Sequence, residues 1–170
     1  MAISTIDSSG ITSVLGSTIT GSQSVPKSTL PTGCILQVVS ASIYGENATQ
    51  STTFVSAGLA ASITPSSATS KVLILVNGAS FGVSGNAEGY FTIDRSGTNL
   101  GNGVGGFGRV WNQASTNYTF VPGILMYLDS PATTSSRTYT VQYRQTNGAQ
   151  QVYIGGGAGT SSIILMEVAA

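Results

Sequence analysis

The residue types that most enzymes and metal sites need are scarce in this chain. It has no histidine, which excludes Ser-His-Asp and Cys-His catalysis in their usual form, and a single cysteine, Cys34, which excludes a multi-cysteine zinc site and an intrachain disulfide. Paired carboxylates could still cleave a glycosidic bond. The six candidates are widely spaced along the chain: Asp7, Glu46, Glu88, Asp94, Asp129 and Glu167. We therefore expect no enzyme, no metal and no other cofactor.

Two further patterns could bind a ligand. The glycine-rich segment 101–108 lacks the Gly-Lys-Ser/Thr ending of a phosphate loop and precedes no helical pattern, so it predicts a loop or bulge. Trp111 could stack on a sugar ring, with Arg109 and Asn112 binding its hydroxyl groups. The alternative for Trp111, as for the other aromatic residues of the chain, is packing in the core or in an interface.

The composition limits the possible partners. Charged residues make up only 7% of the 170 residues, and the net charge is zero. The six basic residues are scattered, so we expect no nucleic-acid binding, and no apolar run is long enough to predict a membrane span. The first residues lack the pattern of a signal peptide, so we expect no secretion. A monomer with so few charges tends to associate, which favours a protein that works in an assembly.

The elements that would position these residues are short strands. In segment 137–145, Tyr139, Val141 and Tyr143 alternate with polar residues, as in a half-buried strand. Similar segments lie at 34–44, 54–64, 71–83, 88–101, 118–129, 150–154 and 161–169, with turns at Arg95-Ser96-Gly97 and a hairpin signal at 146–148. About eight to ten strands with no helical stretch predict an all-β fold, an antiparallel two-sheet jelly-roll sandwich.

Two of these segments are apolar at nearly every position. A strand on the surface of a sandwich has one polar face, so continuous apolar runs need cover on both sides, from central packing or from a subunit interface. With so few charges we expect an interface. Its predicted residues are Ile124, Leu125, Met126, Tyr127, Ile163, Ile164, Leu165 and Met166. The run 72–76 likewise indicates a strand buried on both faces.

Residues 1–33 differ from the rest of the chain. They contain scattered apolar residues, two prolines and no sustained period, so they cannot form a core alone. We divide the chain into an extended N-terminal attachment arm, 1–33, and a β-sandwich domain, 34–170. The predicted anchors of the arm are Ile3, Ile6, Ile11, Val14, Leu15 and Ile19.

Four segments together resemble a known group of proteins. CILQVVSASIYG (34–45), AGLAASITPSSATSKVLILVNGA (57–79), YLDSPATTSSRTYTVQYR (127–144) and SSIILMEVA (161–169) are similar in order and spacing to small structural proteins of tailed phages. Members of that group resemble jelly rolls of the tumour-necrosis-factor type. The resemblance implies a homotrimer in a virion, either as capsid decoration or as the head of a fibre.

We therefore expect a virion structural protein, a homotrimeric cement protein on the outer surface of a phage capsid. Its arm would grip the major capsid protein or another virion protein, and burial of apolar anchors on three arms would stabilise the head. The alternative is a head or tail fibre module that binds host-surface glycans through Arg109, Trp111 and Asn112.

Overall fold

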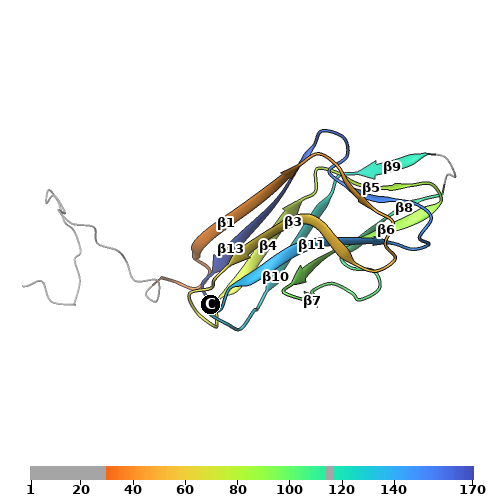
Figure 1. Ribbon diagram of the computed structural model, residues 1–170. Helices are drawn as coiled ribbons and strands as arrows, with labels where there is room; N and C mark the ends of the chain where they lie inside the picture. The colour runs from red at the N-terminus through yellow and green to blue at the C-terminus, as the bar shows by residue number, and fades with distance from the viewer. Residues whose placement is uncertain (1–29, 114–116) are drawn as a thin grey trace, which may run out of the picture.

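The computed structural model describes residues 30–113 and 117–170, which form a sandwich of antiparallel strands (Figure 1). Residues 1–29 of the predicted arm, which include all of its anchors, lie outside the described residues. No helix of the described part is long and apolar enough to cross a membrane. The strands are β1 (Ile35–Tyr44), β2 (Asn47–Thr49), β3 (Val55–Ile63), β4 (Lys71–Asn77), β5 (Phe81–Ser84), β6 (Ala87–Arg95), β7 (Thr98–Asn99), β8 (Gly108–Asn112), β9 (Tyr118–Val121), β10 (Ile124–Asp129), β11 (Arg137–Gln145), β12 (Val152–Ile154) and β13 (Thr160–Val168).

The strand order confirms the predicted jelly roll. Sheet A has the order β1-β13-β4-β10, and sheet C has the order β3-β11-β6-β7, with β8 also paired to β6. Taking β1, β3, β4, β6, β8, β10, β11 and β13 as first to eighth, the two layers run 1-8-3-6 and 2-7-4-5. This interleaving of two Greek keys is the jelly-roll topology.

The core lies between the two layers and follows the alternation of the strands. Tyr139, Val141 and Tyr143 of β11 are buried, as the sequence predicts. They face Ile74 of β4, Leu165 of β13 and other buried residues of sheet A in one hydrophobic cluster. Burial of each such side chain contributes about 1.5–3 kcal/mol relative to exposure.

A third sheet, sheet B, continues sheet A beyond a line of glycines. Its order β2-β12-β5-β9 repeats that of sheet A because each short strand is joined in sequence to a strand of sheet A. The breaks fall near Gly45, Gly155, Gly78 and Gly123 on the four strands, and we call this line the glycine seam. A Cβ at Gly155 would lie 2.1 Å from the carbonyl oxygen of Gly45, so the strands can approach only without a side chain there. A Cβ at Gly78 or Gly123 would likewise lie within 2.5 Å of the Phe81 ring, so three of the four glycines have a packing role.

Turn chemistry explains one predicted hairpin and fails for another. Ser96 and Gly97 both have positive φ, 47° and 94°, which a two-residue turn of type I′ requires between β6 and β7. The hairpin predicted at Thr146-Asn147-Gly148 is wrong, because β11 belongs to sheet C and β12 pairs with β2 and β5. The chain crosses there from one sheet to another.

A buried carboxylate binds the loop between β3 and β4 at the end of the sandwich near Leu30. Glu167 of β13 is fully buried and accepts hydrogen bonds from the backbone N–H and the hydroxyl of Ser66, at 2.7 and 2.6 Å. It also accepts one from the amide of Gln37 at 2.6 Å. Burial acts to raise the pKa of Glu167, but the hydrogen bonds from Ser66, Gln37 and Ser70 outweigh it and lower the pKa below its usual range. The loop 64–70 is therefore fastened by a charged acceptor.

Candidate functional site

The strand registers bring exposed apolar residues together on the outer face of sheet A. One row across the sheet is Val38, Met166, Leu73 and Leu128, and the next is Ser40, Ile164, Leu75 and Met126. A third row contains Ser42, Ser162, Asn77 and Ile124. We call these three rows the apolar face, since aliphatic side chains dominate toward β4 and β10 while serines lie toward β1.

Among the residues of these three rows, the exposed fraction of the side chains is high on β10, an edge strand of sheet A in the described part of the chain. Ile124, Met126 and Leu128 are 73%, 68% and 47% exposed. Val38 on β1 is 56% exposed, whereas Leu73 and Leu75 on the central strand β4 are half-buried by their neighbours. Large contiguous apolar patches of this kind are rare on monomeric proteins and mark interaction surfaces.

The structure corrects the predicted interface residues by separating the two sides of each strand. Ile124, Met126, Ile164 and Met166 point outward and belong to the apolar face. Leu125, Ile163 and Leu165 are at most 5% exposed within the single chain, so they pack in its core and cannot form a subunit interface.

Tyr127 also turns inward, where its ring packs against Phe107 at a centroid distance of 5.2 Å. The prediction that strand 72–76 is buried on both faces is wrong for the single chain, because Leu73 and Leu75 lie on the apolar face. Val38, Leu73, Leu75 and Leu128 were missed. Strand alternation along segments 34–44, 71–77 and 124–129 could have grouped these residues on one side of each strand.

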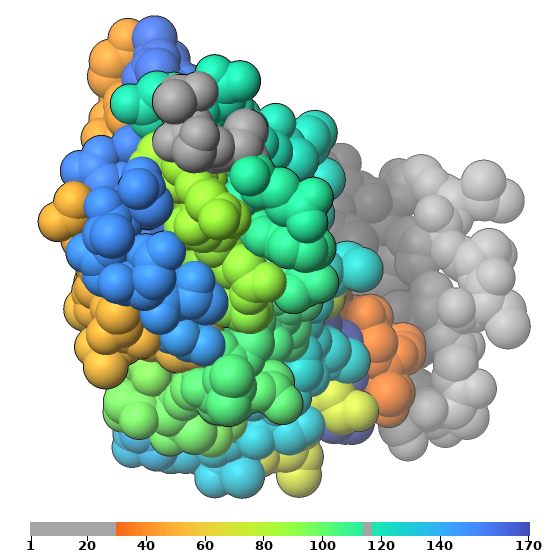
Figure 2. Space-filling model, turned by 90° about the vertical axis from the view of Figure 1, so that its right-hand side faces the viewer, coloured from red at the N-terminus to blue at the C-terminus, as the bar shows by residue number. Residues whose placement is uncertain are grey.

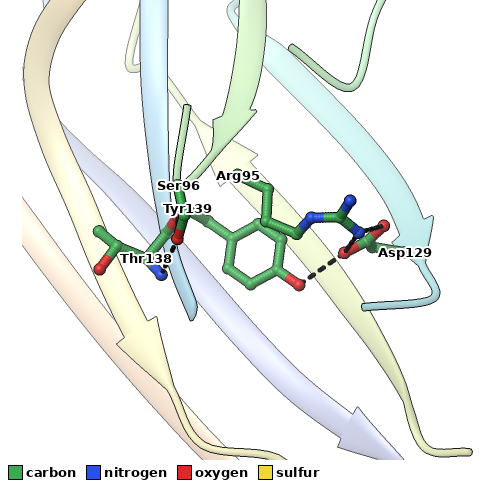
Figure 3. A network of polar contacts seen from close by, with 5 residues as sticks. All are labelled: Arg95, Ser96, Asp129, Thr138 and Tyr139. Atoms are coloured by element: carbon green, nitrogen blue, oxygen red, sulfur yellow. Dashed lines mark hydrogen bonds and ion pairs between the residues drawn. The ribbon is translucent and has the colours of Figure 1, made fainter. Parts of the chain in front are cut away.

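A buried polar network holds the end of β10 against the other layer (Figure 3). Asp129 is only 4% exposed and accepts hydrogen bonds from one guanidinium nitrogen of Arg95 at 2.8 and 2.9 Å. It also accepts the hydroxyl proton of Tyr139 at 2.7 Å. Burial, and then the bond to this carboxylate, raises the pKa of Tyr139 well above its ordinary value, so the hydroxyl remains a donor.

The same network includes the turn after β6. Ser96 donates its backbone N–H to the carbonyl of Thr138 at 2.9 Å, and Thr138 donates its own N–H to the Ser96 hydroxyl at 3.1 Å. Arg95, Asp129 and Tyr139 thus join β6 and β11 of sheet C to β10 of sheet A. The strand with the most exposed apolar side chains is fixed in position by charge as well as by packing.

The predicted glycan-binding residues do not form one site. Arg109 and Trp111 lie on the outer face of sheet C, where the guanidinium sits 5.4 Å from the ring centroid and pairs with Glu88 at 3.0 Å. Asn112 alternates to the opposite side of β8, is 5% exposed, and donates its amide to the carbonyl of Asn117. The prediction is therefore corrected for Asn112, which has a structural hydrogen bond in the interior.

The outer face of sheet C continues as a row of alternating cations and rings. Arg109, Tyr90 and Arg144 are neighbours across β8, β6 and β11. The Arg144 guanidinium lies 4.6 Å from the Tyr90 centroid and 5.4 Å from that of Phe54, and it donates to the carbonyls of Val104 and Thr52. These bonds fasten two loops to the sheet, so the row stabilises the fold.

The carboxylates within the described residues are engaged in separate contacts. Asp94 accepts the N–H of Gly97 at 2.8 Å in the β6–β7 turn, and Glu46 accepts that of Gly157 at 3.4 Å. Asp129, Glu167 and Glu88 have the different partners given above. Residues 30–113 and 117–170 contain no cluster of three or more residues with metal-ligating side chains from His, Cys, Asp and Glu. Asp7 lies outside the described residues.

Comparison with known proteins gives no further assignment. No protein-family model matches this chain, and no curated protein matches it.

Proposed function

We propose that the protein is a virion structural protein, a homotrimeric capsid decoration protein that attaches to a phage head through its N-terminal arm. The observation that carries the proposal is the apolar face of sheet A. Leu, Ile, Val and Met hold eight of its twelve positions, on the outside of a sheet whose other side already faces the core. A second copy of the chain is a suitable cover, because it brings the same apolar surface and needs no complementary charge.

The exposed fractions indicate how much association this face can support. Burying a methionine side chain is worth about 1.5–3 kcal/mol, and Met126 retains 68% of its exposure in the single chain. Its burial in an interface would therefore contribute about 1–2 kcal/mol per chain. Three copies give about 3–6 kcal/mol, which is about 10²–10⁴-fold in the association constant. The number of chains and the viral location are supported by the resemblance to phage structural proteins.

The first test measures assembly. The full-length protein and the variant Met126→Lys are compared by light scattering and native mass spectrometry over a range of concentrations. We expect the parent to be a trimer and Met126→Lys to dissociate at concentrations where the parent does not. Val104→Lys is the matched control, because Val104 is 71% exposed and lies in the loop 101–107, outside the apolar face. A monomeric parent, or equal dissociation of both variants, would contradict the proposed interface.

The second test concerns attachment. Residues 34–170 contain every described strand, so a chain shortened to this range should still form the trimer. We expect it to fail to bind phage heads stripped of the native protein, because the predicted anchors Ile3, Ile6 and Ile11 are missing. Heads without the protein should lose their DNA more readily on heating. Full decoration by the shortened trimer, or equal heat survival of bare heads, would overturn the attachment role of the arm or the cement function.

A further inference from the structure

We propose that the outer face of sheet B, beyond the glycine seam, carries a binding site for a neutral glycan. A hollow of about 370 Å³ lies at this end of the sandwich, within the range of about 300–1,000 Å³ typical of small-molecule sites. It is separate from the residues first predicted to bind a glycan, since Arg109, Trp111 and Asn112 are not among those that line it.

The lining of the hollow has the chemistry that sugar hydroxyls require. Gln50, Asn117, Gln150 and Gln151 bring amide side chains, which both donate and accept hydrogen bonds, and Ser84 adds a hydroxyl. A sugar hydroxyl also donates and accepts, so such groups match it in either direction. None of the described residues that line the hollow is charged. The lining therefore favours a neutral sugar over a uronic acid or a phosphorylated glycan.

An aromatic platform stands beside these polar groups. Tyr118 is 63% exposed and lines the hollow, and its ring stacks on that of Phe120 with centroids 6.2 Å apart and planes 11° from parallel. The Tyr153 ring closes the cluster, 5.8 Å from Tyr118 and 5.7 Å from Phe120. An exposed flat ring beside amide groups is suited to receive the apolar face of a pyranose while its hydroxyls are bound from the side.

Both the aromatic platform and the polar residues that line the hollow are held in place by contacts within the chain. Phe120 lies directly over Gly82, where a Cβ would come within 2.3 Å of the ring, so only glycine leaves room for it. The Tyr153 hydroxyl donates to the Gln151 side chain at 2.6 Å, and Gln151 donates its backbone N–H to the Ser84 hydroxyl at 2.9 Å. A site with few side chains left to order loses less free energy on binding.

The hollow lies at the end of the sandwich opposite to the chain ends of the described domain. Leu30 and Ala170 line a different hollow at the other end, while β5 and β9 extend away from it (Figure 1). Figure 2 shows this far end, where the blue chain near residue 150 lies against the lime chain near residue 85. A domain attached through residues that precede Leu30 could therefore present the hollow outward. None of the residues that line the hollow belongs to the apolar face through which the trimer is proposed to form.

The test uses the full-length protein in its native oligomeric state. It is applied to an array of bacterial surface polysaccharides and neutral and anionic oligosaccharides, and hits are measured by isothermal titration calorimetry and saturation-transfer NMR. We expect binding confined to neutral glycans and an affinity about tenfold lower for Tyr118→Ala, the loss that one aromatic contact explains. Gln150→Leu, which keeps the size of the side chain and removes its amide, should also weaken binding.

Tyr44→Ala is the matched control, because Tyr44 is 76% exposed but lies on β1, away from the hollow, and it should bind as the parent does. Binding of anionic glycans alone, or binding unaffected by Tyr118→Ala and Gln150→Leu, would overturn the proposal. No binding across the array would also overturn it. So would a Tyr118→Ala variant that changes the oligomeric state instead of glycan affinity, since that would make the platform a contact between copies. Each result is independent of whether Met126→Lys dissociates the protein.

Discussion

Replacing Asp129 by alanine should destabilise the protein far more than removing a surface carboxylate. Asp129 is the only link from β10 in the network of Figure 3, and its side chain is 5% exposed. The variant would leave the fully buried hydroxyl of Tyr139 and the Arg95 guanidinium without this acceptor. A buried polar group that loses its partner retains the whole cost of its desolvation.

The expected size follows from the burial of the two donors. Breaking a buried ion pair by removing one partner costs about 3–5 kcal/mol. Arg95 keeps 23% of its side-chain exposure and can regain some hydration, so we expect the lower end, about 3 kcal/mol. For a domain of this size about 3 kcal/mol lowers Tm by about 6–12 °C. Tyr139→Phe removes one bond to a charged acceptor and should cost about 1.5 kcal/mol.

The assay is urea unfolding followed by circular dichroism, at one protein concentration because assembly also contributes to stability. Asp129→Ala, Tyr139→Phe and the double variant form a thermodynamic cycle, whose coupling energy measures the interaction of the two side chains. Glu88→Ala is the control, since Glu88 pairs with Arg109, whose side chain is 53% exposed, and such pairs contribute about 0–1 kcal/mol. An Asp129→Ala variant no less stable than Glu88→Ala, or additive effects in the cycle, would refute the reasoning.

Two further predictions concern acid stability and the glycine seam. Glu167 has a lowered pKa in the folded chain, so it contributes stability above the carboxyl pKa of the unfolded chain, about 4.3, and this contribution is lost as the pH falls through the folded value. Glu167→Gln should therefore lower the urea midpoint of unfolding at pH 7. The midpoint of this variant should also fall less steeply than that of the parent between about pH 5 and pH 2, and an equally steep fall would contradict the prediction. Gly155→Ala places a Cβ 2.1 Å from the carbonyl of Gly45 and should cost about 3 kcal/mol or more, whereas Gly157→Ala, which has positive φ but open space, should cost about 1–2 kcal/mol. Equal unfolding midpoints for the two alanine variants would show that the seam tolerates a side chain.

The sequence predicts strands well where one face is polar. In segment 137–145 the alternation of aromatic and hydroxyl residues identifies the buried side of β11, and the structure confirms it. In segments 124–129 and 161–169 apolar residues occur on both sides of the strand, and the polar residues Asp129, Ser161 and Glu167 lie on the buried side. Polarity therefore does not separate the core side from the surface side. The two sides differ only in what covers them, and that depends on the other layer of the sandwich.

Pairing between strands that are far apart in the sequence was the other feature that the sequence could not predict. Turn residues report local backbone conformation, which is why Ser96-Gly97 identifies its hairpin correctly. At 146–148 the same kind of signal is present, but the strand that follows pairs with β2 and β5, about a hundred and about seventy residues earlier in the chain. Likewise the platform of Tyr118, Phe120 and Tyr153 joins β9 to β12 through β5, so no single segment of the sequence contains it.

The glycine seam separates two different outer surfaces on one layer of strands. On the side of sheet A most outward residues are Leu, Ile, Val and Met, whose side chains are suited to pack against a like surface. On the side of sheet B the outward positions hold the exposed rings of Tyr118 and Phe120 beside amide side chains, which both donate and accept hydrogen bonds. In a continuous strand the alternation of inward and outward residues, and the pairing register, would run unchanged through both regions. The apolar face and the lining of the hollow share no residue, so substitutions on one side of the seam need not disturb the other.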